Sequence, residues 1–345
     1  MSIWRRPSSP SFSGRDSAPR RAARLFAVLF CALALGVIAA LMLGSTETDV
    51  FAAVGALFRV DMSDPDLRIV LYVRLPRILA ALLSGSALAV AGVIIQAVLN
   101  NPMAAPNIIG VNSGAGLCAV IFMAILPQAL PFLPLAAFLG ALGASLCIWV
   151  IAAKSGAGRV TVTLVGVAVS SILSAGINTV KTFFPDSVYD VTGFMIGGLA
   201  GVSYDKLMGA GAVIIIGILL AVAFSRGLDL LSLGEDTARG LGVNVRRSRF
   251  LSLMLASALA GAAVSFAGLL GFVGLLVPHI MRRFVGSSHR HLVPAAALGG
   301  AILVLFCDLL ARVLFAPYEL PVGILLSLIG GPFFVALVLA KRKRG

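Results

Sequence analysis

The sequence predicts an all-α polytopic membrane protein with about ten transmembrane helices, and three observations lead to this fold class. Of the 345 residues, 59% are hydrophobic and 12% are charged, and the mean hydropathy is +1.05; ordinary soluble domains do not have this composition. Apolar runs of roughly 20 residues, the length that crosses a bilayer core about 30 Å thick, recur along the whole chain. The short polar segments between them hold most of the basic residues, a pattern typical of multi-pass proteins.

The predicted spans follow one another closely along the chain. In order they are Leu25–Leu43, Ile78–Val98, Ile108–Leu126, Leu135–Ala153, Val160–Thr179, Leu207–Phe224, Leu251–Phe266, Gly268–Phe284, Leu292–Leu310 and Pro321–Ala340. The seventh and eighth are joined by FAGLLG (Phe266–Gly271) without a polar loop. Glycines there allow either a tight reversal, which gives ten spans, or one bent span, which gives nine.

The distribution of the 27 basic residues predicts the orientation. Lys and Arg are retained on the cytoplasmic side during insertion, and an even number of spans with both termini inside places most of them there. Residues 1–24, rich in Arg, Ser and Pro, are expected to be a disordered cytoplasmic tail, and 341–345 a basic one; residues 25–340 form the transmembrane domain. This topology accounts for the net charge of +13, so we expect no nucleic-acid partner. The apolar spans make membrane lipid a partner.

Residues 225–250, SRGLDLLSLGEDTARGLGVNVRRSRF, form a charged island between two apolar runs. Ser232 followed by Glu235 has the spacing of a capping box, and Gly240 or Gly242 provides a stop, so we expect a short helix. Two or three turns are unstable alone and must pack on something. A helix lying on the lipid surface is the alternative, but two adjacent acids disfavour it on a basic membrane face. The segment is therefore predicted to dock another protein.

Several absences narrow the function. The sequence has no G-x-x-x-x-G-K-[ST] phosphate loop and no H-E-x-x-H motif, and the four cysteines and three histidines show no metal-ligand spacing. We therefore predict no enzyme activity, no metal and no cofactor. Charges at mid-span are nearly missing, with Asp308 the nearest candidate at a span end, which disfavours ion coupling. A transporter driven by a separate ATPase is favoured, and an ion-coupled secondary transporter is the alternative.

Six ordered motifs carry a resemblance to a known family. They are RLPR (Arg74–Arg77), GSALAVAGVIIQ ending at Gln96, NNPMAAPNIIGVNSGAG ending at Gly116, LGEDTARGLGV (Leu233–Val243), GFVGLLVPHIMR (Gly271–Arg282) and ELPVGILLSLIGGPFF (Glu319–Phe334). Together they resemble the FecCD family, the permeases of iron-siderophore, haem and vitamin B12 ABC importers. The resemblance implies a homodimer in the bacterial inner membrane, an ABC ATPase subunit below it and a periplasmic binding protein above it. The cargo expected is an iron chelate, a ferric siderophore by frequency, with haem and cobalamin as alternatives.

The resemblance also implies roles for residues at both faces. Arginines at the outer ends of spans, Arg74, Arg77 and Arg312, are expected to receive acidic residues of the binding protein, since the Arg fork suits carboxylates. Interfacial snorkelling, or pairing with Asp64, Asp66, Asp308 or Glu319, is the alternative. The inner island corresponds to the coupling helix that contacts the ATPase. Its expected residues are Gly234, Glu235, Asp236, Ala238, Arg239, Leu241 and Gly242.

The translocation path has three candidate stretches. Asn101, Pro102 and Met103 interrupt the apolar pattern on the inside and are gate candidates, with a plain helix-to-helix turn as the alternative. The fifth predicted span carries a small polar stripe, Gly166, Ser170, Ser174 and Asn178, which either lines a wet path or lets helices pack closely. Residues 183–205 are expected to fold as a short outer helix near the mouth, with Met195 facing the cargo.

Overall fold

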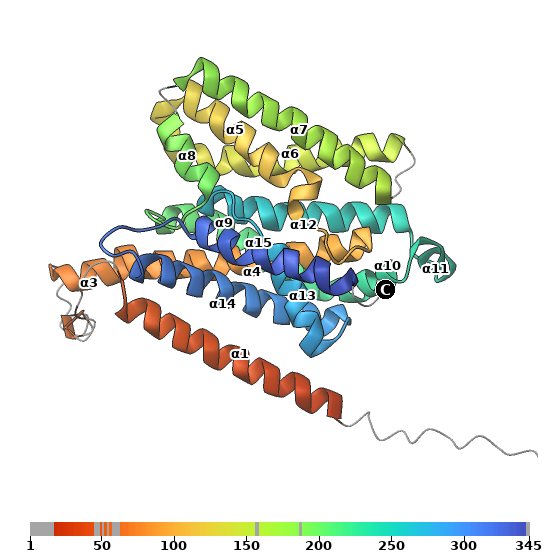
Figure 1. Cartoon of the computed structure of the whole chain (residues 1–345), viewed down its shortest axis with the longest axis horizontal. Helices are drawn as coiled ribbons and strands as arrows, with labels where there is room; N and C mark the ends of the chain where they lie inside the picture. Colours follow the sequence, from red (N-terminus) through yellow and green to blue (C-terminus); the bar gives the residue numbers. More distant parts are fainter. Residues whose placement is uncertain are drawn as a thin grey trace, which may run out of the picture.

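The computed structural model describes residues 17–44, 49, 52–53, 55–56, 63–155, 159–185 and 188–342. Within these ranges every regular element is a helix (Figure 1). The long elements are α1 (Ser17–Met42), α4 (Leu75–Leu99), α5 (Val111–Ile125), α6 (Leu133–Lys154), α7 (Arg159–Phe183), α9 (Tyr204–Ala223), α12 (Val245–Ala267), α13 (Val273–Val285), α14 (His289–Val313) and α15 (Val322–Arg342). The short ones are α3 (Pro65–Ile69), η1 (Val70–Arg74), η2 (Pro106–Ile109), η3 (Pro127–Phe132), α8 (Val188–Ile196), α10 (Ser225–Ser232) and α11 (Glu235–Gly240).

The predicted all-helical membrane fold is confirmed, because each predicted span corresponds in order to one long helix. Seven of the described helices are long and apolar enough to cross a membrane, while α5 and an apolar stretch of α15 are shorter. The shortest is α13, with 13 residues. At a rise of about 1.5 Å per residue, α13 covers only part of a bilayer core. The helical structure is therefore interrupted inside the bundle, just before α13.

That break resolves the ambiguous junction between the seventh and eighth predicted spans. The chain leaves α12 at Gly268, with φ 68° and ψ −163°, and enters α13 after Phe272, with φ 64°. A helix cannot continue through left-handed backbone, so two helices replace the single bent span. α1 begins at Ser17 and its candidate membrane span at Ala23, so the helix extends into the predicted tail, and the boundary of the transmembrane domain at residue 25 stays a prediction. Residues 1–16 and 343–345 lie outside the described residues.

Small residues let the central helices touch backbone to backbone. Gly85 on α4 faces Gly300 on α14, where an added Cβ would lie 2.1 Å from a carbonyl oxygen, and Gly92 on α4 faces Gly274 on α13 at 1.9 Å. Van der Waals contact of this kind drives helix association where no hydrophobic effect operates. Together with α12, α4 forms the buried centre of the bundle.

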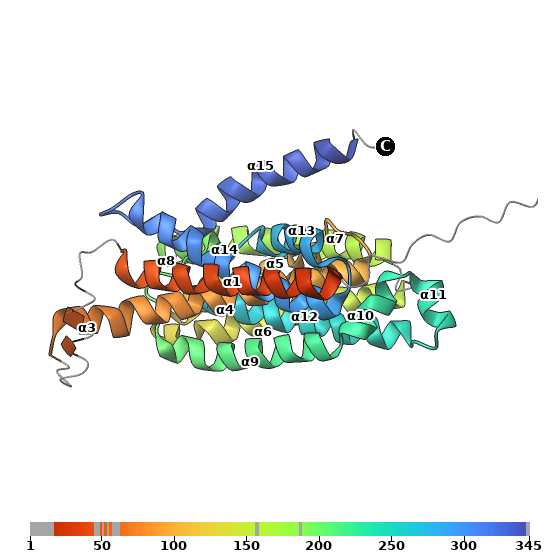
Figure 2. The same ribbon diagram turned by 90° about the horizontal axis from the view of Figure 1, so that it is seen from below.

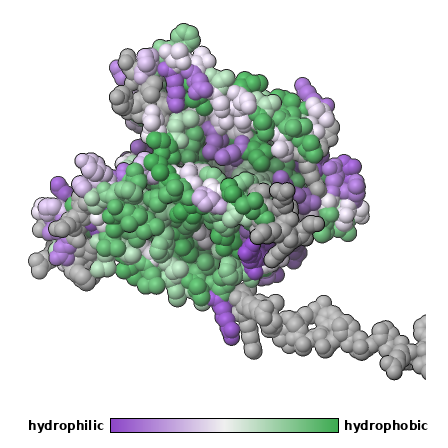
Figure 3. Space-filling model, in the orientation of Figure 1, coloured by the Kyte–Doolittle hydropathy of each residue, from purple (hydrophilic) through white to green (hydrophobic). Residues whose placement is uncertain are grey.

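The helices run along one axis, which gives the molecule two distinct ends. Figure 1 shows α11 at one end and α3 with α8 at the opposite end. On the face in Figure 3 a broad apolar band lies between the more hydrophilic ends, as expected of a bilayer-spanning bundle. Figure 2 shows α15 leaning away from the other helices. We call the two ends the α11 end and the α8 end.

Candidate functional site

The charged island forms two short helices at the α11 end, α10 and α11, followed by the first turns of α12. The capping-box prediction is wrong: Ser232 ends α10, its hydroxyl donates to the Asp229 carbonyl at 2.7 Å, and Gly234 with φ 111° is the N-cap of α11. The predicted stop is confirmed, since α11 ends at Gly240 and Gly242 has φ 82°. A glycine on each side therefore delimits a helix of six residues.

Inward-facing side chains anchor α11 to the bundle. The Glu235 carboxylate bonds Arg239 at 2.6 Å and the buried Arg249 of α12 at 3.1 Å, and Ala238 is 0% exposed. Charge-assisted pairs to a buried arginine hold this short helix where its own hydrogen bonds would not. Ala238 is thus not accessible to a partner, contrary to the expected contact, and Glu235 has its carboxylate engaged within the chain.

The outward-facing residues of α11 and of the turns on either side of it are exposed. Leu233 and Leu241 are 60% and 59% exposed, and Asp236 and the Arg239 side chain are also exposed. Exposed leucines flanked by charges are typical of an interaction surface. We call Leu233, Asp236, Arg239 and Leu241 the coupling surface.

A second anchor joins α10 to the start of α14. The Asp229 carboxylate accepts from the backbone N–H of His289 at 2.9 Å and lies 2.6 Å from its Nδ1. His289 is buried. Asp229 and His289 are 60 residues apart in the sequence. The sequence therefore gave no signal that they pair, except that both were predicted to lie on the inner side.

At its other end, α12 reaches a junction built almost entirely from backbone. The Ala267 carbonyl accepts from Gly198 at 2.9 Å, the Leu269 N–H donates to Phe194 of α8 at 3.0 Å, and Gly323 of α15 donates to Gly197 at 3.1 Å. The chain thus connects the coupling surface, through α12, to α8 and the start of α15. We call this set of contacts the glycine junction.

Two open grooves that share Asn107 have both polar and apolar residues in their lining. One, of about 570 Å³, is lined by Ser170, Ser174 and Asn178 of α7 together with Asn107 of η2. The predicted α7 stripe therefore lines an open groove, while Gly166 lies against the Ile108 carbonyl, 1.9 Å from an added Cβ.

The second groove, of about 660 Å³, shares Asn107 and adds Asn112, Met195 and Ser327. The predicted outer helix is present as α8, and Met195 lies on this wall. The sequence gave no role to Asn107, Asn112 or Ser327, although both asparagines stand inside the NNPMAAPNIIGVNSGAG motif. Polar side chains in otherwise apolar spans were the available signal.

The inner loop after α4 forms a compact turn. Asn101 Oδ1 accepts from the Met103 N–H at 3.0 Å and the Asn101 carbonyl accepts from Ala104 at 3.1 Å. Asn101 and Pro102 are exposed and Met103 is half-buried. The loop has the geometry of an ordinary Asx turn, so the gate role of these three residues stays a prediction.

The three predicted docking arginines are buried near the α8 end. Arg77 bonds Asp308 at 3.0 Å and Glu319 at 2.6 Å, Arg312 lies 3.2 Å from Asp308, and the Arg74 guanidinium donates to the Leu41 carbonyl. The alternative of pairing with Asp308 and Glu319 is thus confirmed for Arg77. Two Arg312 nitrogens, Nε and Nη2, are buried without a hydrogen-bond partner, and docking stays a prediction.

The fold and these sites define a class of protein: a multi-pass transport subunit with partly polar grooves across its span and an anchored interaction surface at one end. The FecCD transport family matches residues 32–340, and the chain belongs to this family. It is thus the membrane-spanning permease subunit of an ABC importer, and ATP hydrolysis is carried out by a separate subunit.

Individual relatives agree with this assignment. The chain is 38% identical to the hemin transport system permease HmuU of Yersinia pestis, covering 84% of this chain and 88% of the relative. It is 38% identical to the Fe(3+)-citrate import system permease YfmD of Bacillus subtilis, covering 96% and 97%. A solved structure described as an inward-facing conformation of a metal-chelate type ABC transporter is similar with a TM-score of 0.82 at 30% identity, covering 92% of this chain and 99% of that one.

Proposed function

We propose that this permease imports a ferric siderophore, which a binding protein delivers at the α8 end and an ATPase drives from the α11 end. The observation that carries the proposal is the pair of grooves, because each has amide and hydroxyl side chains set among apolar ones. Asn107, Asn112, Ser174 and Asn178 offer neutral amides and a hydroxyl, which suit a hydrophilic, oxygen-rich chelate. They hold it weakly enough for release, because no charged side chain lines either groove.

Haem is the rival cargo, since one relative is named for hemin and another for ferric citrate. A large apolar macrocycle would contact the apolar part of the lining and leave the amides and hydroxyls without partners. Cells that lack the gene are given radioactive iron as ferric siderophores or as haem, with the matching binding protein expressed. Restored siderophore uptake without haem uptake supports the proposal. The reverse result assigns haem instead.

The coupling surface is proposed to contact the ATPase. Leu241 and Leu233 supply apolar area, and Asp236 and Arg239 supply charge on a helix held from behind by Glu235. Truncating a central interface residue commonly costs more than 1 kcal/mol, so Leu241→Ala should weaken ATPase capture about ten-fold.

A matched pair of charge reversals tests whether ATPase binding depends specifically on the α11 end. Asp236 and Asp205 are both exposed acids in the first turn of a helix, at opposite ends of the molecule. Asp236→Lys should weaken ATPase binding, and Asp205→Lys should leave it unchanged. Equal effects of the two variants would remove the coupling assignment.

The α11 end is proposed to be cytoplasmic, with both termini inside the plasma membrane of a bacterium. Exposed arginines gather there, including Arg226, Arg239, Arg246 and Arg247, as expected of loops retained during insertion. A Thr237→Cys variant should react with an impermeant thiol reagent only after the cells are opened. Reaction in intact cells would contradict this orientation.

A homodimer is proposed to close the open grooves. Large apolar side chains that line the grooves are exposed, among them Val167 of α7 at 57% and Leu328 of α15 at 69%. A second copy over this face would convert the grooves into an enclosed path and cover these side chains. Leu219 of α9 is 64% exposed and provides the control. In a cysteine-free background, Leu328→Cys should crosslink two copies and Leu219→Cys should not; the opposite pattern would contradict this interface.

The arginine cluster is proposed to receive the binding protein. Nη2 of Arg312 is a buried donor without a hydrogen-bond partner, while its Nε lies 3.2 Å from Asp308, so Nη2 can donate to a new carboxylate. Glu319, whose side chain is 30% exposed, occupies Arg77 at the surface. An incoming acid would replace Glu319 on Arg77. Glu319→Gln should therefore tighten capture of the binding protein several-fold, and Arg312→Gln should weaken it. Unchanged capture in both variants would contradict docking at this cluster.

A further inference from the structure

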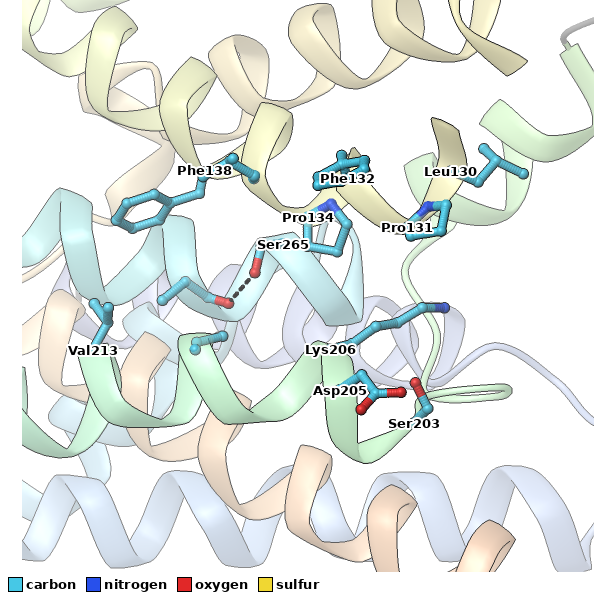
Figure 4. Close-up of a pocket in the computed structure, with 14 residues that line it drawn as sticks. Leu130, Pro131, Phe132, Pro134, Phe138, Ser203, Asp205, Lys206, Val213 and Ser265 are labelled. Carbon is cyan, nitrogen blue, oxygen red and sulfur yellow. Dashed lines mark hydrogen bonds between the residues drawn. The ribbon is translucent and has the colours of Figure 1, made fainter. Parts of the chain in front are cut away.

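A groove away from the polar path lies between η3–α6 and α9, with α12 as its floor (Figure 4). Its volume is about 690 Å³, within the range of small-molecule sites. The wall from η3 and α6 includes Leu130, Phe132 and Leu135, all exposed large apolar side chains. The floor is made of small residues, Ala262 and Ser265 of α12. Its position on the apolar surface of a membrane protein makes lipid the surrounding medium.

One face of α9 forms the other wall. Lys206, Gly209, Ala210 and Val213 fall at positions i, i+3, i+4 and i+7, so they share one face of the helix over two turns, about 10 Å. Gly209 leaves the wall recessed, since no atom lies within 4 Å of an added Cβ there. The result is a slot with a flat, small-residue lining that runs along the helix axis.

Polarity along the slot is strongly uneven. Ser203, Asp205 and Lys206 stand together at the α8 end of α9, and Figure 4 shows Lys206 reaching across the space between α9 and η3. The remaining lining is apolar except for Ser265, and its hydroxyl already donates to the Ala262 carbonyl at 2.8 Å. A ligand that fills the groove therefore needs one polar end and one long apolar part.

We propose that this groove binds a phospholipid with a primary ammonium headgroup, such as phosphatidylethanolamine, in the leaflet at the α8 end. Lys206 lies at the end of a transmembrane helix, at headgroup depth. Its Nζ approaches one protein acceptor, the Gly201 carbonyl at 3.4 Å, and an ammonium has three donors, which leaves donors for a phosphate. The adjacent Asp205 repels a purely anionic headgroup and accepts hydrogen bonds from the lipid ammonium.

The lipid would also complete the packing of α9. Both α6 and α9 pack on α12, and α9 also contacts α4 and α14; an acyl chain in the slot would add an apolar neighbour on the side of α9 that faces α6. The site lies at the start of α9, and the coupling surface follows α10 at the other end of that helix.

Two glycine variants provide a matched test. Gly209 and Gly143 are both exposed helical glycines with no atom within 4 Å of an added Cβ, but only Gly209 lines the groove. Both substitutions favour the helix, since glycine is about 1 kcal/mol worse than leucine there. The purified full-length permease is stripped of lipid, incubated with phosphatidylethanolamine, phosphatidylcholine or phosphatidylglycerol, and examined by native mass spectrometry.

The wild-type chain and Gly143→Leu should retain phosphatidylethanolamine in preference to the other two lipids. Retention should fall about ten-fold in Gly209→Leu, which fills the slot, and in Lys206→Gln, which loses a charge-assisted bond. Asp205→Asn should abolish the preference over phosphatidylglycerol. Equal retention by Gly209→Leu and Gly143→Leu, or equal binding of all three lipids by the wild type, overturns the proposal. Lys206→Gln leaves the helix packing intact, so its result stands even if Gly209→Leu folds poorly.

Discussion

The glycine junction gives the sharpest quantitative prediction, for Gly268→Ala. Gly268 has φ 68° and ψ −163°, a region that only glycine adopts readily, and a side chain there costs about 1–3 kcal/mol. An added Cβ would lie 2.4 Å from the Phe194 carbonyl oxygen, so the two segments must separate by about 1 Å to reach ordinary contact. This disturbs the Leu269–Phe194 and Gly198–Ala267 hydrogen bonds, each worth about 1 kcal/mol. The expected destabilisation is about 3–5 kcal/mol.

Gly271→Ala is the matched control for this change. Gly271 lies three residues further along the same break, its φ is not in the left-handed region, and an added Cβ meets nothing within 4 Å. Its effect should stay within about 0.5 kcal/mol. The assay is unfolding of the purified permease in mixed micelles, followed by circular dichroism, together with cargo uptake in cells. Equal unfolding free energies for the two variants would refute the reasoning about the junction.

Three further changes test other parts of the structure. Asp308→Asn should lower the unfolding free energy by about 3–5 kcal/mol in the same micelle assay, because it leaves two buried arginines without their shared carboxylate; a change below about 1 kcal/mol would mean the pairs contribute little. Asp229→Ala should free the start of α14 and increase hydrogen exchange at the His289 backbone N–H, because it removes the carboxylate oxygen that accepts from this N–H at 2.9 Å; unchanged exchange would show that this anchor does not hold the segment. Ser174→Phe should block uptake while leaving ATPase capture intact, since it fills the α7 groove and lies away from the coupling surface; normal uptake would place the path elsewhere.

Sequence reasoning succeeded where the determining property is local. Hydrophobicity over about 20 residues predicts a span wherever it occurs, so the ten long helices were anticipated in order, whereas short ones such as α3 and α10 were not. The island at residues 225–250 was visible because charge in a membrane protein contrasts with its surroundings. The α7 stripe followed from helical periodicity, with Ser170, Ser174 and Asn178 on one face.

Prediction from the sequence failed where several nearby groups compete for one hydrogen bond, and where the residues in contact are far apart in the sequence. Ser232 had the pattern of an N-cap, but α10 continues to that residue. Its hydroxyl donates to the Asp229 carbonyl of the same helix. Arg77 and Asp308 are 231 residues apart, and only the packing of α4 on α14 brings them together. The lining roles of Asn107 and Asn112 depend in the same way on how η2 and α5 sit beside α7 and α15, which no spacing in the sequence specifies.

The most direct test of the account is solute accumulation in reconstituted vesicles. Vesicles that hold this permease alone should accumulate no ferric siderophore under a proton or sodium gradient. Addition of the ATPase, ATP and the loaded binding protein should produce uptake that Leu241→Ala reduces. Gradient-driven accumulation by the permease alone would instead show an ion-coupled transporter and contradict the central claim that the driving force enters through the coupling surface.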